Sequence, residues 1–142
     1  MQCFSFWYTM AFMRHLGIDF GTKRVGLSIS DDQENIAFPL SVIENSDHLV
    51  DDIVSICLEK EVRGVVVGDS KDFSMKDNQV MKYVNIFVAD FREKINIPVF
   101  FHPEFLTSLE AKQIQGKNDM LDASAATIML QSYLDTQKND IN

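Results

Sequence analysis

Several features that mark specialised protein classes are scarce or missing in this chain. It has only two cysteines, Cys3 and Cys57, which cannot form a disulfide framework, and no CxxC pair typical of a zinc site. No stretch reaches the roughly 18 consecutive apolar residues that a membrane helix needs. Basic residues number 13 against 21 acidic ones, and the net charge of −8 cannot by itself hold the chain on nucleic acid. We therefore expect no membrane partner and a reducing compartment, the cytoplasm.

Enough apolar sequence is present for one folded domain. Hydrophobic residues make up 46% and charged residues 24% of the 142 positions, as in an ordinary globular domain. We expect this domain to span residues 13–135. Residues 1–12 are apolar but lack the charged region and cleavage site of a signal peptide. We interpret them as an extension of the gene start beyond Met13, or as a tail that touches a membrane or a partner. Residues 136–142 form a polar tail that is expected to fray.

Short apolar runs alternate with amphipathic stretches from Met13 onward. This pattern predicts strands at residues 15–20, 25–30, 37–43, 63–68 and 97–101. It predicts helices at residues 49–57, with Ser46 or Asp47 as the cap, at 80–95 and at 122–135, and a short helix near Thr107. The tight turn GTKR indicates an antiparallel hairpin, and the later strand–helix–strand units indicate parallel pairing. We expect an α/β fold with a mixed sheet, three antiparallel strands followed by two parallel ones, and helices on both faces.

An aspartate inside an apolar strand is the sharpest local signal. Strand alternation places His15, Gly17 and Asp19 on one face of the first strand. Burying an unpaired carboxylate costs several kcal/mol, so Asp19 must meet cations, be protonated or lie at an exposed strand end. Lys23 and Arg24, in the following turn, supply donors suited to a phosphate. The alternative is a carboxylate that only holds the hairpin.

Two further acidic residues stand at the ends of predicted elements. Glu104 follows the last predicted strand, and Asp122 begins the last predicted helix. Either residue alone is typical of a solvated charge or a helix cap, and Asp119 competes for the cap. With Asp19 they would form an oxygen-only ligand set, which selects Mg²⁺ or Mn²⁺. Two such ions about 4 Å apart can clamp a scissile phosphate, so the set indicates phosphodiester hydrolysis.

The order of motifs resembles the YqgF-type family, also described as Holliday-junction-resolvase-like or as pre-16S rRNA nucleases. The segments that carry the resemblance are GIDFGTKRVGLSISD (17–31), the proline of AFPLSVI (37–43), RGVVVGDS (63–70), EFLTSLEA (104–111) and LDASAATIMLQSYLD (121–135). They cover most of the chain from Met13 onward. The resemblance implies a ribonuclease-H-like fold and a nuclease that processes the 5′ end of pre-16S rRNA in ribosome biogenesis.

The same resemblance assigns roles to individual residues. It implies that Asp19, Glu104 and Asp122 are catalytic and hold two Mg²⁺ or Mn²⁺ ions. It implies that Lys23, Arg24 and Thr107 contact nucleic acid, which is structured RNA or junction DNA. A monomer or a weak homodimer is expected.

The middle motif departs from the family pattern. The family usually has Asp-Glu-Arg where this chain has Pro103, Glu104 and Phe105, preceded by His102. A missing arginine removes a bidentate phosphate clamp, which favours the alternative of a catalytically weak or inactive nucleic-acid-binding scaffold. A Holliday-junction resolvase is a further alternative and would need a symmetric dimer. The segment GIDFGT also resembles the phosphate hairpin of actin-like ATPases, but those proteins need two lobes and several hundred residues.

Overall fold

A computed structural model describes the backbone of residues 13–69, 79–103 and 119–141, and side chains within 13–69, 81–103 and 124–138. Eight helices and strands lie in these ranges. In chain order they are β1 (Arg14–Phe20), β2 (Arg24–Ser30), β3 (Ala37–Glu44), α2 (Leu49–Glu59), β4 (Val62–Asp69), α3 (Gln79–Lys94), β5 (Val99–Pro103) and α5 (Asp119–Ile141).

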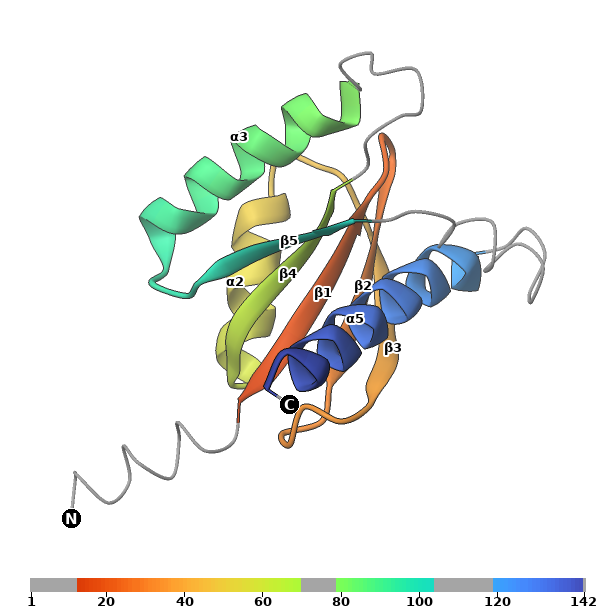
Figure 1. Ribbon diagram of the computed structural model, residues 1–142. Helices are drawn as coiled ribbons and strands as arrows, with labels where there is room; N and C mark the ends of the chain where they lie inside the picture. Colours follow the sequence, from red (N-terminus) through yellow and green to blue (C-terminus); the bar gives the residue numbers. More distant parts are fainter. Residues whose placement is uncertain (1–12, 70–78, 104–118, 142) are drawn as a thin grey trace.

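The five described strands form one mixed sheet in the order β3-β2-β1-β4-β5 (Figure 1). The pairs β1–β2 and β2–β3 are antiparallel, whereas β1–β4 and β4–β5 are parallel. The predicted sheet is therefore confirmed. β3 is an edge strand, and its register shifts where Ser28 pairs with Pro39, a residue that cannot donate a backbone hydrogen bond.

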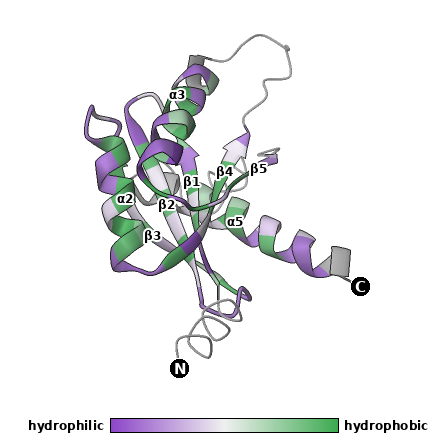
Figure 2. Ribbon diagram, turned by 90° about the vertical axis from the view of Figure 1, so that its left-hand side faces the viewer, coloured by the Kyte–Doolittle hydropathy of each residue, from purple (hydrophilic) through white to green (hydrophobic). Residues whose placement is uncertain are grey.

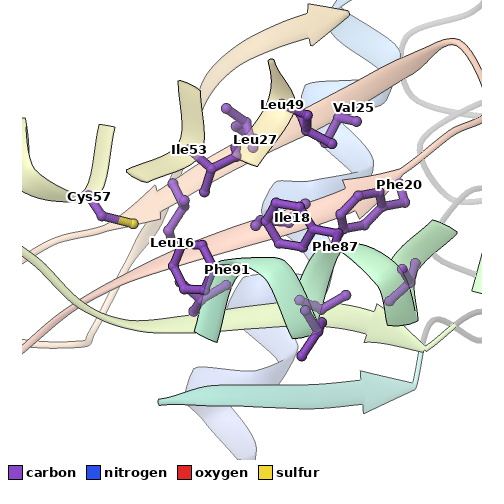
Figure 3. Close-up of a cluster of buried hydrophobic side chains, with 14 of the residues drawn as sticks. Leu16, Ile18, Phe20, Val25, Leu27, Leu49, Ile53, Cys57, Phe87 and Phe91 are labelled. Carbon is purple, nitrogen blue, oxygen red and sulfur yellow. The ribbon is translucent and has the colours of Figure 1, made fainter. Parts of the chain in front are cut away.

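Helices cover both faces of the sheet, as predicted. Helices α2 and α3 lie on one face and α5 crosses the other, with hydrophobic and hydrophilic residues interleaved along each helix (Figure 2). Under α2 and α3 the strands present branched and aromatic side chains, including Leu16 and Ile18 of β1, which are fully buried (Figure 3). A smaller cluster lies under α5 and consists of Ala37, Val66, Met129, Leu130, Tyr133 and Leu134. Among the described helices, none is long and apolar enough to span a membrane.

The last helix is longer than predicted. It begins at Asp119 and continues through Ile141, whereas the sequence predicted residues 122–135 followed by a frayed tail. Two hydrogen bonds involve residues beyond Asp135. The Thr136 hydroxyl donates a hydrogen bond to the Ser132 carbonyl at 2.9 Å. Lys138 donates to the side chain of Asn35 in the β2–β3 loop, so a tertiary contact holds the last turns.

Two other boundaries also differ from the prediction. Helix α2 begins after His48, and no side chain caps it, so the prediction that Ser46 or Asp47 caps this helix is wrong. The Ser46 hydroxyl instead accepts a hydrogen bond from the His48 amide at 3.2 Å, which closes a local turn before the helix. Strand β5 lies two residues later than predicted because its ladder with β4 runs from Val99 to Pro103.

Candidate active site

Asp19 lies near the carboxyl end of β1, the central strand of the sheet, and is half-buried. It pairs with Gly26 of the antiparallel strand β2. On the other side Ile18 pairs with Val67 of β4, and the next residue of β4 is Gly68. The carboxylate is thus flanked on both neighbouring strands by residues without a side chain. Because β1, β4 and β5 are parallel, their carboxyl ends meet at this same edge of the sheet.

Helix α5 packs unusually close to β1 because Gly17 lies beneath it. A Cβ atom on Gly17 would lie only 2.9 Å from Leu130 Cβ and would overlap Ser28 Oγ. The buried Ser28 hydroxyl donates to the Ala126 carbonyl at 2.8 Å, which fixes the helix over β1 and β2. Glycine is therefore required at position 17 by the close approach of the helix.

The direction of α5 brings its first turns to the edge where Asp19 lies. The ring of Tyr133 contacts the ring of His15, near the start of β1, with a centroid distance of 5.6 Å. Ala126 lies further along, over Gly17, so the helix runs antiparallel to β1 (Figure 1). Asp122 precedes Ala126 by four residues and occupies the same helix face, one turn closer to this edge. The fold therefore brings the positions of Asp19 and Asp122 to the same end of the sheet.

The other predicted catalytic residue cannot be placed. Glu104 follows Pro103, the last residue of β5, and lies outside the described residues, as do Phe105 and Thr107. Within the described part of the chain, no three histidine, cysteine, aspartate or glutamate residues gather where they could bind a metal ion. What this part does offer is the carboxylate of Asp19, an oxygen donor of the kind that Mg²⁺ and Mn²⁺ prefer.

The turn between β1 and β2 carries the two predicted phosphate-binding residues, Lys23 and Arg24, and both are exposed. The Gly21 amide donates to the Arg24 carbonyl at 2.8 Å, and a Cβ on Gly21 would lie 2.5 Å from that carbonyl oxygen. Asn45 also supports the turn: its side-chain amide donates to the Gly21 carbonyl at 3.0 Å and its backbone amide to the Lys23 carbonyl at 2.9 Å. No sequence signal indicated Asn45, because it reaches the turn from the end of β3.

His102 lies on the α5 face of the sheet, in the row that contains Asp19. It pairs with Gly68 of β4, the strand that lies between β1 and β5. Its Nε2 atom lies 3.0 Å from the Ser132 hydroxyl oxygen, and partial burial lowers the pKa of the ring below its usual value. A further carboxylate that sequence reasoning did not single out, that of Asp69, ends β4; its Oδ1 atom is buried and has no hydrogen-bond partner among the described residues.

A second group of titratable residues lies near the opposite end of β1. His15 is 4% exposed, and its Nδ1 atom lies 3.1 Å from Glu34 Oε1, an ion-pair distance without the alignment of a hydrogen bond. Burial lowers the pKa of His15 and raises the pKa values of Glu34 and Tyr133. A Cβ atom on Gly64 would lie 2.9 Å from His15 Nε2, so the ring fills the space above that glycine. This group packs the far end of α5 and is not part of the candidate site.

Solved structures share this arrangement of strands and helices. T. thermophilus RuvC in complex with a Holliday junction substrate matches with a TM-score of 0.61 and 15% identity, over 89% of this chain and 96% of that chain. The Fowlpox virus resolvase, in complex with substrate Holliday junction DNA, matches with a TM-score of 0.56 and 13% identity, over 88% and 99% of the two chains. The domain therefore has the ribonuclease-H-like α/β fold of these resolvases.

Within this class, residues 13–136 match the family RuvX, which is described as Holliday junction resolvase, and the chain belongs to that family. A protein of Caldanaerobacter subterraneus subsp. tengcongensis is 38% identical over 138 residues, which covers 89% of this chain and 99% of that protein. One of Maridesulfovibrio salexigens is 31% identical over 132 residues, with 86% and 98% coverage. Both carry the name "Putative pre-16S rRNA nuclease". The predicted family and enzyme class, a nuclease, are confirmed.

Proposed function

We propose that this protein is a metal-dependent endonuclease that hydrolyses phosphodiester bonds in structured RNA, with the precursor of 16S rRNA as its substrate. The name shared by the two relatives above supports this choice of substrate. The cytoplasm is the proposed location, because rRNA precursors are processed there and the cysteine content fits a reducing compartment.

One observation carries the proposal. Asp19 lies between glycines of the two neighbouring strands, at the edge of the sheet where α5 begins. The two neighbouring strands place glycines, and hence no side chains, on either side of this carboxylate. A phosphate with its counter-ions needs such access. The position of Asp122 on the facing side of α5 would supply a second carboxylate.

We assign the roles of individual residues as follows. Asp19, Glu104 and Asp122 would together hold two Mg²⁺ or Mn²⁺ ions. When bound, such ions activate a water molecule and stabilise the leaving oxygen. Lys23 and Arg24 would hold a backbone phosphate through the exposed turn, and Thr107 would contact the nucleic acid. The metal ions, together with Lys23 and Arg24, would also offset the repulsion between an acidic protein and a polyanion.

The substitution Asp19→Asn tests the assignment because it removes the charge and nearly keeps the shape. We expect Mn²⁺- and Mg²⁺-dependent cleavage of structured RNA to fall by at least about 100-fold, since the variant lacks one of the proposed metal-binding carboxylates. Folding should stay nearly intact, because asparagine keeps the size of the side chain and one of its two oxygens. Asp32→Asn is a matched control: Asp32 is exposed in the β2–β3 loop, away from the carboxyl ends of the parallel strands. If Asp19→Asn retains full turnover, the proposed mechanism is wrong.

Junction DNA is the second candidate substrate, favoured by the description of the family and by the two resolvase structures. A four-way DNA junction should be included in the same assay, together with sedimentation of the protein, because resolution of a junction requires a symmetric dimer. Paired cuts in the junction by a dimer would select this candidate. Absence of any cleavage or metal binding would instead select a non-catalytic scaffold.

A further inference from the structure

A groove between α2 and α3 lies on the face of the sheet opposite to α5. Its volume is about 380 Å³, within the range of about 300–1,000 Å³ that is typical of ligand sites. The described residues that line it are Thr22, Asn45, Ser46, Asp47, Leu49, Val50, Tyr83, Ile86, Phe87 and Asp90. We call it the α2–α3 groove.

The groove has an apolar floor and one apolar wall. Leu49 and Phe87 are buried and belong to the main core cluster (Figure 3), and both line the groove, so we call them its floor. Tyr83 and Ile86, three residues apart on α3, are 52% and 61% exposed and form the wall. These two exposed side chains, beside the buried Leu49 and Phe87, give the groove apolar surface that a partner could cover.

The charge of the groove is of one sign. The charged side chains that line it are the carboxylates of Asp47 and Asp90, both exposed, and its described lining includes no lysine or arginine. Outside the groove the same two helices carry charges of both signs, with exposed carboxylates at Asp52 and Glu93 and exposed cations at Lys82, Arg92 and Lys94. The surface of the groove itself repels the phosphates of a nucleic acid and attracts a cation. The groove therefore does not serve the nuclease substrate in the way that Lys23 and Arg24 would.

We propose that the α2–α3 groove binds a basic, amphipathic polypeptide segment of a partner protein. An apolar side chain of the segment would insert against Leu49 and Phe87, and its lysine or arginine residues would lie at Asp47 and Asp90. Helices that place apolar residues into a groove, with complementary charges at its rim, bind in this way. The proposal does not rest on the identity of the nuclease substrate.

The groove also adjoins the β1–β2 turn, which carries Lys23 and Arg24. Thr22 belongs to that turn, and Asn45, which lines the groove, hydrogen-bonds the Gly21 and Lys23 carbonyls. A partner in the groove would therefore contact residues that hold Lys23 and Arg24, although it would occupy the face of the sheet away from α5. A partner in the groove and a nucleic acid at Lys23 and Arg24 would thus lie next to each other without overlapping.

The charge of the groove can be tested with a synthetic probe. A fluorescein-labelled peptide of about 14 residues, with leucine and lysine at helical spacing, is titrated with the full chain while anisotropy is recorded. The double variant Asp47→Asn/Asp90→Asn should weaken binding about tenfold or more. The control Asp52→Asn/Glu93→Gln removes the same charge from the same helices outside the groove and should change binding by less than about threefold. Equal losses in both variants would show attraction by net charge alone and overturn the proposal.

The apolar wall is tested in the same assay. Tyr83→Ser/Ile86→Ser should weaken peptide binding about tenfold, whereas Leu58→Ser, a substitution on α2 at a residue that is 68% exposed and outside the groove, should not. Thermal unfolding of each variant verifies the fold. A labelled single-stranded RNA of about 12 nucleotides is titrated in parallel. If the Tyr83→Ser/Ile86→Ser variant loses RNA binding but keeps peptide binding, the groove holds nucleobases and the proposal is wrong.

Discussion

The two faces of the sheet are held to their helices by different kinds of contact. Under α2 and α3 the contacts are between large apolar side chains. The rings of Phe20 and Phe87 lie 5.0 Å apart, and those of Phe87 and Phe91 lie 5.5 Å apart. Under α5 a smaller apolar cluster is present, but directly beneath the helix the strands present Gly17 and Ser28, and the Ser28 hydrogen bond and close backbone approach also hold the helix.

Hydrogen bonds recur along the α5 face. The Gln131 side chain accepts from the Ala37 amide at 2.9 Å and donates to the Asn35 carbonyl at 3.0 Å. Apolar contacts are non-directional, whereas hydrogen bonds require a defined distance and angle. The comparison therefore separates two roles: the α2–α3 face holds the larger apolar cluster, and the hydrogen bonds of the α5 face fix the position of the helix that carries Asp122.

The largest expected effect tests the first half of this comparison. Phe91 is fully buried in the main cluster, so Phe91→Ala should lower the free energy of unfolding by about 3–5 kcal/mol through lost burial and a residual cavity. Urea denaturation measures the loss. Cleavage per folded molecule, assayed well below the melting temperature, should stay within about twofold of the parent protein, because α5 keeps its contacts. A tenfold loss of cleavage per folded molecule would show that the two faces are not separable.

A smaller loss of stability with a larger loss of activity is expected on the other face. In Gly17→Ala the new Cβ atom would meet Leu130 Cβ at 2.9 Å, and the Ser28 side chain could avoid it only by giving up its bond to Ala126. Helix α5 must therefore move, at a cost of about 1–3 kcal/mol. Because α5 carries Asp122, cleavage per folded molecule should fall at least about tenfold, since small misplacements of a catalytic group have large effects.

Gly64→Ala provides a matched control for this substitution. Its Cβ would lie 2.8 Å from the His15 ring, so the crowding is similar, but His15 lies at the far end of β1 from Asp19. We expect a comparable loss in the free energy of unfolding and nearly unchanged cleavage per folded molecule. If both variants lose activity to the same extent, crowding anywhere under α5 is sufficient and the position of its first turns is not the cause.

The same division explains what the sequence could predict. Period-2 alternation in β1 placed Leu16 and Ile18 on one face and Asp19 on the other, because an apolar face must be buried. The helical stripe with Val84, Phe87 and Phe91 was predicted for the same reason, and all three are buried. The candidate catalytic residue Asp19 was singled out because a charge inside an apolar strand breaks this pattern.

Contacts of the α5 face could not be predicted in this way. Ser28 and Ala126 are 98 positions apart and bond through a hydroxyl and a carbonyl, neither of which changes any local periodicity. Asn45 likewise supports the β1–β2 turn from 24 positions away. Beyond the predicted end of α5, Lys138 contacts the β2–β3 loop. Tertiary polar contacts of this kind leave no local signal, so the sequence could predict the fold but not the residues that position the site.

The smallest expected effect concerns the pH dependence of the α5 face. Burial lowers the pKa of His15, so the folded state holds this ring neutral at a pH where the unfolded chain already protonates it. The unfolded state then binds more protons, and stability falls as the pH drops below the unfolded pKa of about 6.5. The loss is at most about 1.4 kcal/mol per pH unit, and it ends once the pH reaches the lowered pKa of the folded state.

The test compares the parent protein with His15→Gln by urea denaturation between about pH 5.5 and pH 7.5. The stability difference should shift in favour of the variant as the pH falls, because only the parent protein carries the titrating ring. Burial raises the pKa of Glu34, so this carboxyl makes the folded state more stable as the pH falls, which is the opposite of the effect of His15. Glu34 titrates closer to the normal pH range of a carboxyl than to that of a histidine. The variant Glu34→Gln should therefore leave the His15 effect in place. If the parent protein instead gains stability relative to His15→Gln at lower pH, the ion pair with Glu34 outweighs burial and holds the ring protonated.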